Sequence, residues 1–389
     1  MFKYDVVIVG AGPSGAITAY WCAKYGLSTL VIEKCRLPRY KPCGGAVSSR
    51  AMKELDFKID EVVKQTYYEG KIFRPKGDFL TLKSNTPLAV GVLRSEFDDL
   101  LIQKAKSQGA HIKEGIKVEK VTRDNAEVTI SCEGGFKATA DFIVAADGVN
   151  SIVAKQTGLR SRLPPNEVAL ACVFEKKLGK QAIADLGMDS LEFYMGLTPA
   201  GYGWIFPKGD YLSVGAGSLL NEIGQVKMMF PNFINKVNKI GNIKLQNPDW
   251  HLVPIGGKNR SISEGRTILV GDAAGFVDPL IGEGITYAIL SGKNAAISIK
   301  TAIETREPEK ASQIYKRNCK ELLDDLSYAY FVATKIYYHT DLMMSPFLAD
   351  KRLGEFLTDV IKGDKNYKTF ILNSMKRLPI SFLKMLLNR

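Results

Sequence analysis

The pattern of apolar and polar positions at the start of the chain predicts a strand–turn–helix–strand unit. Residues 4–9 form an apolar, β-branched run typical of a buried strand. A glycine-rich turn follows, then residues 16–25 have the composition of a helix, and residues 28–32 predict a second strand. This order is that of a parallel βαβ unit, in which helices cover the sheet.

Later segments add further strands and then helices. Residues 121–145 predict several short strands, with turns at residues 124–125 and 134–135, and residues 267–272 predict another buried strand. Residues 311–339 have helical spacing of apolar and aromatic positions, for which core packing is the default explanation. The chain is therefore expected to be an α/β protein whose later half contributes additional strands and helices.

Composition limits the class of protein. At 389 residues the chain is long enough for two domains, and 46% hydrophobic with 24% charged residues is an ordinary globular balance. No uncharged apolar run approaches the roughly 20 residues of a membrane span, and the N-terminus does not have the form of a signal peptide. A net charge of +12 favours anionic partners.

Cysteine and histidine content argues against a metal site. The six cysteines form no CxxC pair, which indicates neither a zinc site nor a disulfide framework. Reduced thiols in the cytoplasm fit this content best. Three histidines, His111, His251 and His339, make a histidine-based metal site or catalytic triad an unfavoured interpretation.

The first glycine-rich turn has the form of a dinucleotide-binding fingerprint. Gly10, Gly12 and Gly15 stand in GxGxxG spacing directly after the first predicted strand. Gly10 permits the tight turn, Gly12 lets the backbone approach a pyrophosphate, and Gly15 allows close packing of helix on strand. Glu33 ends the second predicted strand, where a carboxylate can accept hydrogen bonds from a ribose. An ordinary glycine turn is the alternative, and the context favours nucleotide binding.

A second Gly-Asp pair, far along the chain, favours FAD over a nicotinamide cofactor. Gly271 and Asp272 end the strand predicted at residues 267–272, and a second glycine-rich turn into a helix follows. Asp147 and Gly148 follow another apolar run. A nicotinamide dehydrogenase would not need this return to its first nucleotide site. Taken singly, Asp272 has the alternative role of a helix N-cap and Asp147 that of a turn residue.

Together these motifs resemble the glutathione-reductase-type flavoproteins, in the branch that contains the aromatic hydroxylases. The resemblance implies that Arg94 contacts FAD and that Asp272 binds the ribityl chain. It also implies that the turn at residues 279–284 starts a helix whose positive end faces the flavin N1–C2=O2 edge. The implied cofactor-binding residues are Gly10, Gly12, Pro13, Ser14, Gly15, Glu33, Lys34, Arg94, Asp147, Gly148, Gly271, Asp272, Pro279, Gly282, Gly284 and Ile285.

Two further segments resemble the geranylgeranyl reductase family, and the resemblance extends over about residues 4–303. One segment is Pro-Cys-Gly-Gly at residues 42–45, and the other is Tyr-Gly-Trp-Ile-Phe-Pro at residues 202–207. Members of this family saturate isoprenoid chains on lipids, chlorophyll precursors or quinones. The resemblance implies that the flavin reduces carbon–carbon double bonds of a prenyl chain.

Three aromatic residues of the second segment are candidates for substrate binding. Tyr202, Trp204 and Phe206 alternate along a predicted strand, so all three side chains are expected to face one side. Periodicity alone favours sheet core that faces the C-terminal helices. The resemblance implies instead an apolar wall for the prenyl chain, with polar tips on Tyr202 and Trp204 that can orient a substrate.

Cys43 is the predicted proton donor, in a catalytic loop that it shares with Gly44 and Gly45. An isolated alkene accepts a hydride when its other carbon is protonated, and a thiol can supply that proton. Water or a tyrosine is an alternative donor, and a structural free thiol is the alternative role of Cys43. Basic residues beside the loop either contact a substrate phosphate or are solvated, namely Arg36, Arg39 and Lys41.

The end of the chain is basic and amphipathic. Residues 365–389 contain no acidic residue, and Pro379 is expected to divide them into two short helical pieces. Basic amphipathic helices bind the surface of anionic membranes, and a terminal helix pair packed on the catalytic body is an alternative of nearly equal weight. No nucleic-acid recognition module is visible. The basic residues are Lys365, Lys368, Lys376, Arg377, Lys384 and Arg389.

The expected fold is α/β, a Rossmann-like FAD-binding domain with an inserted antiparallel-sheet substrate domain and a C-terminal helical region. The FAD-binding domain is expected to comprise residues 1–36, 97–159 and 265–305, and the substrate-binding (catalytic) domain residues 37–96 and 160–264. Residues 306–389 form the helical region, to which membrane association is assigned.

The expected activity is an FAD-dependent reduction of carbon–carbon double bonds in geranylgeranyl or prenyl chains, in lipid (or prenyl quinone or pigment) biosynthesis. The expected location is the cytoplasm, at the inner face of the cell membrane. Expected partners are a prenylated lipid and an electron donor, which is NAD(P)H or a ferredoxin-like carrier; neither a metal nor nucleic acid is expected. The alternatives are an FAD-dependent monooxygenase acting on an apolar or aromatic substrate and a non-catalytic flavin- or lipid-binding protein.

Overall fold

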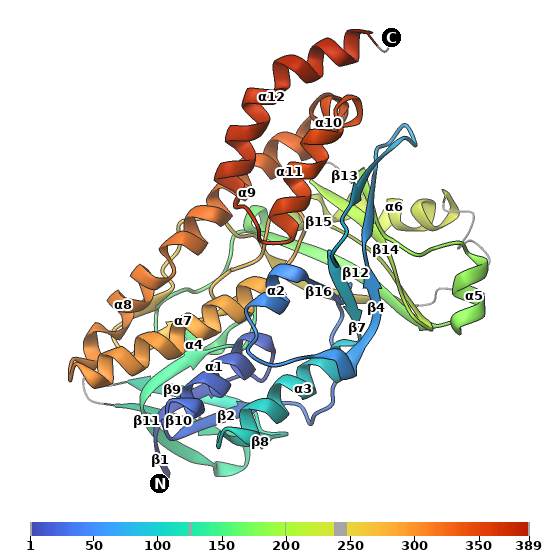
Figure 1. Cartoon of the computed structure of the whole chain (residues 1–389). Coiled ribbons are helices and arrows are strands. Elements are labelled where there is room, and N and C mark those ends of the chain that lie inside the picture. The colour runs from blue at the N-terminus through green and yellow to red at the C-terminus, as the bar shows by residue number, and fades with distance from the viewer. Residues whose placement is uncertain (1, 124–126, 199, 237–246, 388–389) are drawn as a thin grey trace. The chain divides into compact units, whose positions relative to one another are not determined.

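The computed structural model of the protein describes residues 2–123, 127–198, 200–236 and 247–387. The chain divides into two compact units, each assembled from three segments (Figure 1). Unit 1 comprises residues 1–41, 94–164 and 254–326, and unit 2 comprises residues 42–93, 165–253 and 327–389. The functional domains expected from the sequence remain a prediction. The turn expected at residues 124–125 lies outside the described residues.

Unit 1 is built on a sheet of eight strands among the described residues, with the order β17-β18-β11-β1-β2-β8 and with β10 and β9 branching from β11. β1 pairs in parallel with β2 and β11, and β11 pairs in parallel with β18. The strands are β1 (Phe2–Val9), β2 (Thr29–Glu33), β8 (His111–Glu114), β9 (Val118–Arg123), β10 (Val128–Cys132), β11 (Lys137–Ala145), β17 (Ser263–Glu264) and β18 (Thr267–Leu269). The expected βαβ unit is confirmed.

Helix α1 packs between α3 and α7 in unit 1 (Figure 1). The approach of α7 to α1 depends on Gly292, because a Cβ there would lie 2.6 Å from the Ser14 carbonyl oxygen. This close packing holds the start of α1 beside the turn that precedes α7. The helices are α1 (Pro13–Lys24), α3 (Arg94–Ser107), α4 (Ile152–Gln156), α7 (Ile285–Glu304) and α8 (Ala311–Asn318).

Unit 2 contains a seven-stranded sheet among its described residues, with the order β16-β12-β15-β14-β13-β5-β6. β12, β15, β14 and β13 pair antiparallel in turn, as the sequence predicts, whereas β13 pairs in parallel with β5. A second, three-stranded sheet has the order β3-β7-β4. The strands are β3 (Ala46–Ser48), β4 (Val63–Tyr67), β5 (Glu69–Phe73), β6 (Phe79–Lys83), β7 (Ala89–Val92), β12 (Val168–Lys177), β13 (Leu191–Thr198), β14 (Gly201–Lys208), β15 (Tyr211–Leu219) and β16 (Asp249–Pro254).

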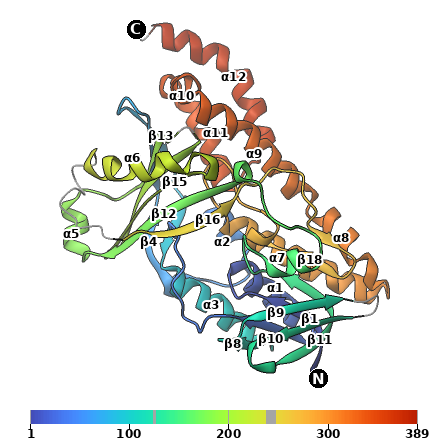
Figure 2. The same cartoon turned by 180° about the vertical axis from the view of Figure 1, so that it is seen from behind.

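One face of the seven-stranded sheet is covered by α6, as Figure 2 shows. Ile205 and Val214 on the strands form a buried cluster with Phe230 and Phe233 of α6. This apolar contact leaves the opposite face of β14 for the aromatic row described below. The helices that join these strands are α2 (Ser49–Lys53), α5 (Lys180–Asp185) and α6 (Ile223–Lys236).

The chain ends in four helices, α9 (Lys320–Tyr338), α10 (Thr340–Ala349), α11 (Lys351–Ile361) and α12 (Tyr367–Leu387). The expectation that Pro379 divides the last segment into two pieces is wrong, because α12 runs through it as one helix. Proline removes one intrahelical hydrogen bond, and Pro379 is exposed, so water can satisfy the carbonyl that loses its partner. Among the described helices, none has the length and apolarity needed to cross a membrane.

Asp350, between α10 and α11, fixes how α12 packs. Its carboxylate accepts hydrogen bonds from Arg377 Nε at 2.6 Å, Lys384 Nζ at 2.9 Å and Ser381 Oγ at 3.0 Å. The Arg377 guanidinium, followed by Lys384 and Ser381, holds the pKa of the Asp350 carboxyl well below its usual range. Two of the tail's basic residues therefore make internal contacts, and they set which side of α12 faces inward.

Candidate active site

The first glycine turn is formed by contacts that leave no room for side chains. A Cβ at Gly10, whose φ is +102°, would lie 2.3 Å from the Ala146 carbonyl oxygen, and one at Gly15 would lie 2.0 Å from the Gly10 carbonyl oxygen. The Glu33 carboxylate accepts a hydrogen bond from the Ala11 amide at 2.8 Å, which ties the end of β2 to the turn. The turn is therefore rigid, and it delivers the chain into α1.

The N-terminus of α1 is open for an anion. Its N-cap, Gly12, provides no side-chain cap, and Pro13 occupies the first turn. Among the described residues, a Cβ at Gly12 would meet only Arg39 Nη2, at 3.8 Å. Uncapped amides at a helix start attract phosphate groups.

Two predicted cofactor residues, Glu33 and Arg94, are linked by a pair that sequence reasoning did not assign to the cofactor. Arg94 donates to both oxygens of Asp98, at 2.7 and 2.9 Å. Arg39 Nη1 lies 3.2 Å from Asp98 Oδ2, and Arg39 Nε lies 3.9 Å from Glu33 Oε1. Arg39 is therefore largely buried beside Gly12 and is not a solvated residue, whereas Arg36 is exposed.

The two carboxylate oxygens of Asp147 differ: one accepts hydrogen bonds from the backbone, and the other accepts none among the described residues. Oδ2 accepts hydrogen bonds from the amides of Ile152 at 2.8 Å and Val153 at 3.3 Å. Oδ1 is buried and has no hydrogen-bond partner among the described residues. Burial raises the pKa of the Asp147 carboxyl, although hydrogen bonds oppose this shift. Gly148 follows with a φ of +81°, which a side chain would disfavour.

Arg160 joins the second and third motifs, and sequence reasoning missed it. Its guanidinium donates to the Ala273 carbonyl oxygen at 2.8 Å and to the Val149 carbonyl oxygen at 3.0 Å. Burial lowers the pKa of Arg160, and the nearby Arg260 adds to this effect. No local motif marks this residue, because its partners lie in segments far apart in the sequence.

The third motif forms a turn that leads into α7. Gly271 has a φ of +53°, and its amide donates to Ser291 Oγ at 3.0 Å. A Cβ at Gly284, the N-cap of α7, would lie 3.5 Å from Asp272 Oδ1. Asp272 is thus close to the start of the helix whose first residue is Ile285.

The turn before α7 depends on Asp278, another residue that the sequence did not mark. Its buried Oδ1 accepts hydrogen bonds from the Leu280 amide at 2.8 Å and the Ile281 amide at 3.1 Å. Pro279 is buried inside this turn, and Gly282 closes it with a φ of +66°. Among the remaining cofactor candidates, Ser14 is buried against Gly271, and Lys34 is exposed.

These features of unit 1 fit FAD. The open start of α1 suits a pyrophosphate, and the buried Asp147 Oδ1 lacks a hydrogen-bond partner among the described residues. A long dinucleotide has hydroxyl groups along its length that can donate a hydrogen bond to this carboxylate oxygen. Except for Arg94, at the start of α3, and the turn before α7, the predicted cofactor residues follow the ends of β1, β2, β11 and β18, which are neighbouring strands of one sheet.

In unit 2, the aromatic residues lie on one face of β14, which confirms their predicted alternation. The ring centroids of Tyr202 and Trp204 are 6.1 Å apart, and those of Trp204 and Phe206 are 6.3 Å apart. The facing strand β15 supplies Gly215, where a Cβ would lie 2.1 Å from the Trp204 ring. Trp204 and Phe206 are buried, and Tyr202 is half-buried.

The Cys43 loop lies directly on this aromatic row. A Cβ at Gly44 would lie 2.8 Å from the Phe206 ring and 3.4 Å from Trp204 Nε1. Gly45 has a φ of +71°, and its amide donates to Cys43 Sγ at 3.4 Å. The row therefore packs against the loop and the three-stranded sheet, and not simply against the C-terminal helices. Cys43 itself is half-buried.

Comparisons with known proteins define first the class and then the family. Residues 3–191 match the model of an FAD binding domain, and residues 177–246 match that of a geranylgeranyl reductase catalytic domain. The protein is thus an FAD-dependent oxidoreductase. The chain is 34% identical to the digeranylgeranylglycerophospholipid reductase of Thermoplasma acidophilum, with 82% of this chain and 84% of that protein covered. It is 30% identical to the enzyme of that name from Methanococcus vannielii, with 84% and 86% covered.

Solved structures agree with this assignment. A geranylgeranyl bacteriochlorophyll reductase-like protein from Thermoplasma acidophilum superposes with a TM-score of 0.83 at 25% identity, over 99% of both chains. A halogenase in complex with FAD shares the fold, with a TM-score of 0.71 at 18% identity over 94% of this chain and 85% of that one. The chain belongs to the geranylgeranyl reductase family.

Proposed function

We propose that the protein saturates carbon–carbon double bonds in the geranylgeranyl chains of a glycerophospholipid. The observation that supports this most is the glycine loop of Cys43 seated on Trp204 and Phe206, which joins the two family-specific segments in one apolar site. The relatives named digeranylgeranylglycerophospholipid reductase suggest the lipid class. Tyr202, the most accessible ring of the row, is proposed to contact the prenyl chain.

Cys43 is proposed to deliver the proton. FAD, when bound and reduced, supplies a hydride from N5 to one alkene carbon. The Cys43 S–H bond breaks as its proton passes to the other carbon, and the thiolate regains a proton from water. Because the Gly45 amide donates to Sγ, the thiol proton is left for the substrate, and the same amide stabilises the thiolate that forms. Gly44 and Gly45 keep this loop free of side chains.

The proposed electron donor is NAD(P)H or a ferredoxin-like carrier. The chain has one glycine fingerprint at residues 10–15, so we infer that the donor docks transiently. At the FAD site, Asp272 is proposed to bind the ribityl chain and Glu33 the ribose. The start of α7 is proposed to stabilise negative charge on the reduced flavin.

The reaction is tested with the FAD-loaded protein reduced by dithionite without oxygen and mixed with digeranylgeranylglycerophospholipid. We expect the flavin to be reoxidised and the lipid to gain two hydrogens per reduced bond, measured by mass spectrometry. The control is the same lipid already saturated, which should leave the flavin reduced. A flavin that the unsaturated lipid never reoxidises would contradict the proposal. So would a hydroxylated product that requires NAD(P)H and oxygen, which indicates a monooxygenase.

The exposed side of α12 is proposed to bind the surface of an anionic membrane. Because the Asp350 contacts turn one side inward, the other side presents Met375, Leu383 and Leu372, which are 63%, 58% and 50% exposed. Apolar side chains exposed together mark an interaction surface. We define the outer stripe as Lys368, Leu372, Met375, Lys376, Ile380, Phe382 and Leu383. Its two lysines, with no acidic residue after residue 364, favour anionic lipid as the partner.

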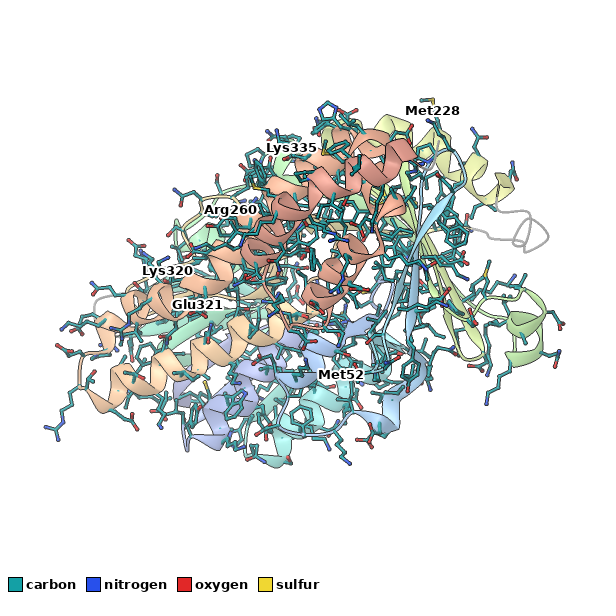
Figure 3. The ribbon with its side chains drawn as sticks, turned by 45° about the horizontal axis from the view of Figure 1, so that its top comes forward. Met52, Met228, Arg260, Lys320, Glu321 and Lys335 are labelled. Atoms are coloured by element: carbon teal, nitrogen blue, oxygen red, sulfur yellow. The ribbon has the colours of Figure 1, made fainter. Side chains whose placement is uncertain are left out.

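Vesicle binding tests the outer stripe. Lys368→Gln with Lys376→Gln should weaken binding to phosphatidylglycerol-containing vesicles by about 30-fold, because each lysine near such a surface contributes roughly 1 kcal/mol. Leu372→Gln with Met375→Gln should weaken binding to neutral phosphatidylcholine vesicles as well. Matched controls are Lys335→Gln and Met228→Gln, on exposed positions of other helices in unit 2 (Figure 3).

Two measurements distinguish a membrane from a second copy of the chain as the partner of the outer stripe. They are sedimentation with vesicles and light scattering without vesicles. Binding to vesicles that is unchanged in both double variants would contradict the membrane proposal. A dimer that becomes a monomer in the Leu372→Gln/Met375→Gln variant would assign the stripe to a second copy of the chain instead.

A further inference from the structure

A buried ion pair lies beneath the Cys43 loop, at the end of the aromatic row. Lys208, the last residue of β14, is 0% exposed and forms an ion pair with Glu175 of β12. Lys208 continues the alternation of Tyr202, Trp204 and Phe206, so all four side chains stand on the same face of the sheet. Burying two charges costs several kcal/mol per ion, and apolar residues of similar volume often stabilise as well or better. Stability alone therefore does not account for this pair.

Three hydrogen bonds lead from the ion pair to the sulfur of Cys43. Lys208 Nζ donates to the Val92 carbonyl oxygen at 3.2 Å. The Val92 amide donates to the Gly45 carbonyl oxygen at 2.8 Å, and the Gly45 amide donates to Cys43 Sγ at 3.4 Å. Each link holds one residue to the next, so a shift of the ammonium group is transmitted to the loop.

Gly45 is where the ammonium group meets the loop. A Cβ there would lie 2.5 Å from Lys208 Nζ and 2.4 Å from the Val92 carbonyl oxygen. The backbone of the loop thus contacts the ammonium group of Lys208, and Glu175 holds that group in place. Separating the members of a buried ion pair is strongly destabilising, because it leaves each charge uncompensated.

We propose that Lys208 and Glu175 are positioning residues, which hold Val92 and Gly45 and thereby fix the thiol of Cys43 in the orientation that proton delivery requires. The proposal rests on the proposed role of Cys43, and it adds two residues that touch neither the flavin nor the alkene in this scheme. In this proposal, residues 202–208 have two roles: the aromatic residues line the site of the prenyl chain, and Lys208 positions the proton donor.

The test replaces the pair with apolar residues of similar volume, Lys208→Met with Glu175→Leu, in a Cys35→Ser background. The first measurement is the rate at which iodoacetamide alkylates Cys43, followed by mass spectrometry between pH 6 and pH 9. The second is the kcat and KM of lipid reduction by the FAD-loaded protein. We expect the alkylation rate to change at least about threefold and kcat to fall by about tenfold or more with little change in KM, since small misplacements of reacting groups are costly.

The matched control is the Lys177–Asp210 ion pair, whose charged atoms are 3.2 Å apart at the edge of the same sheet, with Lys177 exposed and Asp210 half-buried in the turn before β15. Lys177→Met with Asp210→Asn should leave both measurements unchanged. A folded, FAD-loaded Lys208→Met/Glu175→Leu variant with unaltered alkylation and kcat would overturn the proposal. Altered alkylation with unaltered kcat would instead support positioning and remove Cys43 as proton donor. If the double variant does not fold, the Glu175→Gln variant is measured in the same way, because its amide oxygen still accepts a hydrogen bond from Lys208. The same results would support or overturn the proposal.

Discussion

Replacing Cys43 by alanine is expected to lower the turnover of prenyl-lipid reduction by about 100-fold or more, because a positioned general acid contributes a factor of this size. FAD content should be unchanged, since Cys43 lies in unit 2 and the fitted cofactor residues lie in unit 1. The measurements are the rate of flavin reoxidation by the lipid without oxygen and the flavin absorbance of the purified protein.

Two further variants make this result interpretable. Cys35→Ala alters another half-buried free thiol, to which no catalytic role is assigned, and it should retain turnover. Cys43→Ser keeps a weaker acid at the same position, and it should lie between the wild type and the alanine variant. Full turnover in Cys43→Ala would mean that water or another side chain delivers the proton.

The second large effect is expected for Gly15→Ala. The new Cβ would lie 2.0 Å from the Gly10 carbonyl oxygen and 3.0 Å from the Ala146 side chain. Backbone atoms cannot move aside cheaply, so β1, α1 and β11 would have to separate, at about 1–3 kcal/mol or more. We expect FAD affinity to fall by about 100-fold, the equivalent of roughly 2.8 kcal/mol, together with a lower midpoint of thermal unfolding.

Flavin fluorescence during dialysis measures the affinity, and calorimetry measures the unfolding. The matched control is Gly224→Ala in α6, where a Cβ meets nothing within 4 Å. That variant should keep FAD and be slightly stabilised, because alanine is the better helix former. A Gly15→Ala protein that binds FAD normally would show that the turn tolerates a wider separation of helix and strand.

The N-terminal nucleotide-binding unit could be predicted from the sequence because its chemistry is local. Gly10, Gly12, Gly15 and Glu33 stand within one strand–turn–helix–strand unit, so their spacing alone indicates how they meet. The alternation of Tyr202, Trp204 and Phe206 likewise follows from the period of a strand. The later Gly271 and Asp272 were predicted to belong to the site because a strand precedes them and a glycine turn follows.

Residues that act across distant segments could not be found in this way. Arg160 binds carbonyl oxygens of Val149 and Ala273, and Lys208 meets Glu175 across an intervening strand. Nothing in the spacing of these residues indicates the pairing. The role expected for Pro379 was wrong for a related reason, because a local helix-breaking tendency was outweighed by the tertiary packing of α12.

The contacts of Asp350 predict how the packing of α12, which carries the outer stripe, depends on pH. Since its pKa in the folded protein lies below the ordinary value near 3.9, the stabilisation that it provides is fully present above that value. It is lost only as the pH falls further, toward the folded-state pKa. Near neutral pH and in mild acid, the hold on Arg377 and Lys384 is therefore constant. The membrane binding proposed for α12 is therefore expected to vary with the charge of the lipid and not with pH in this range.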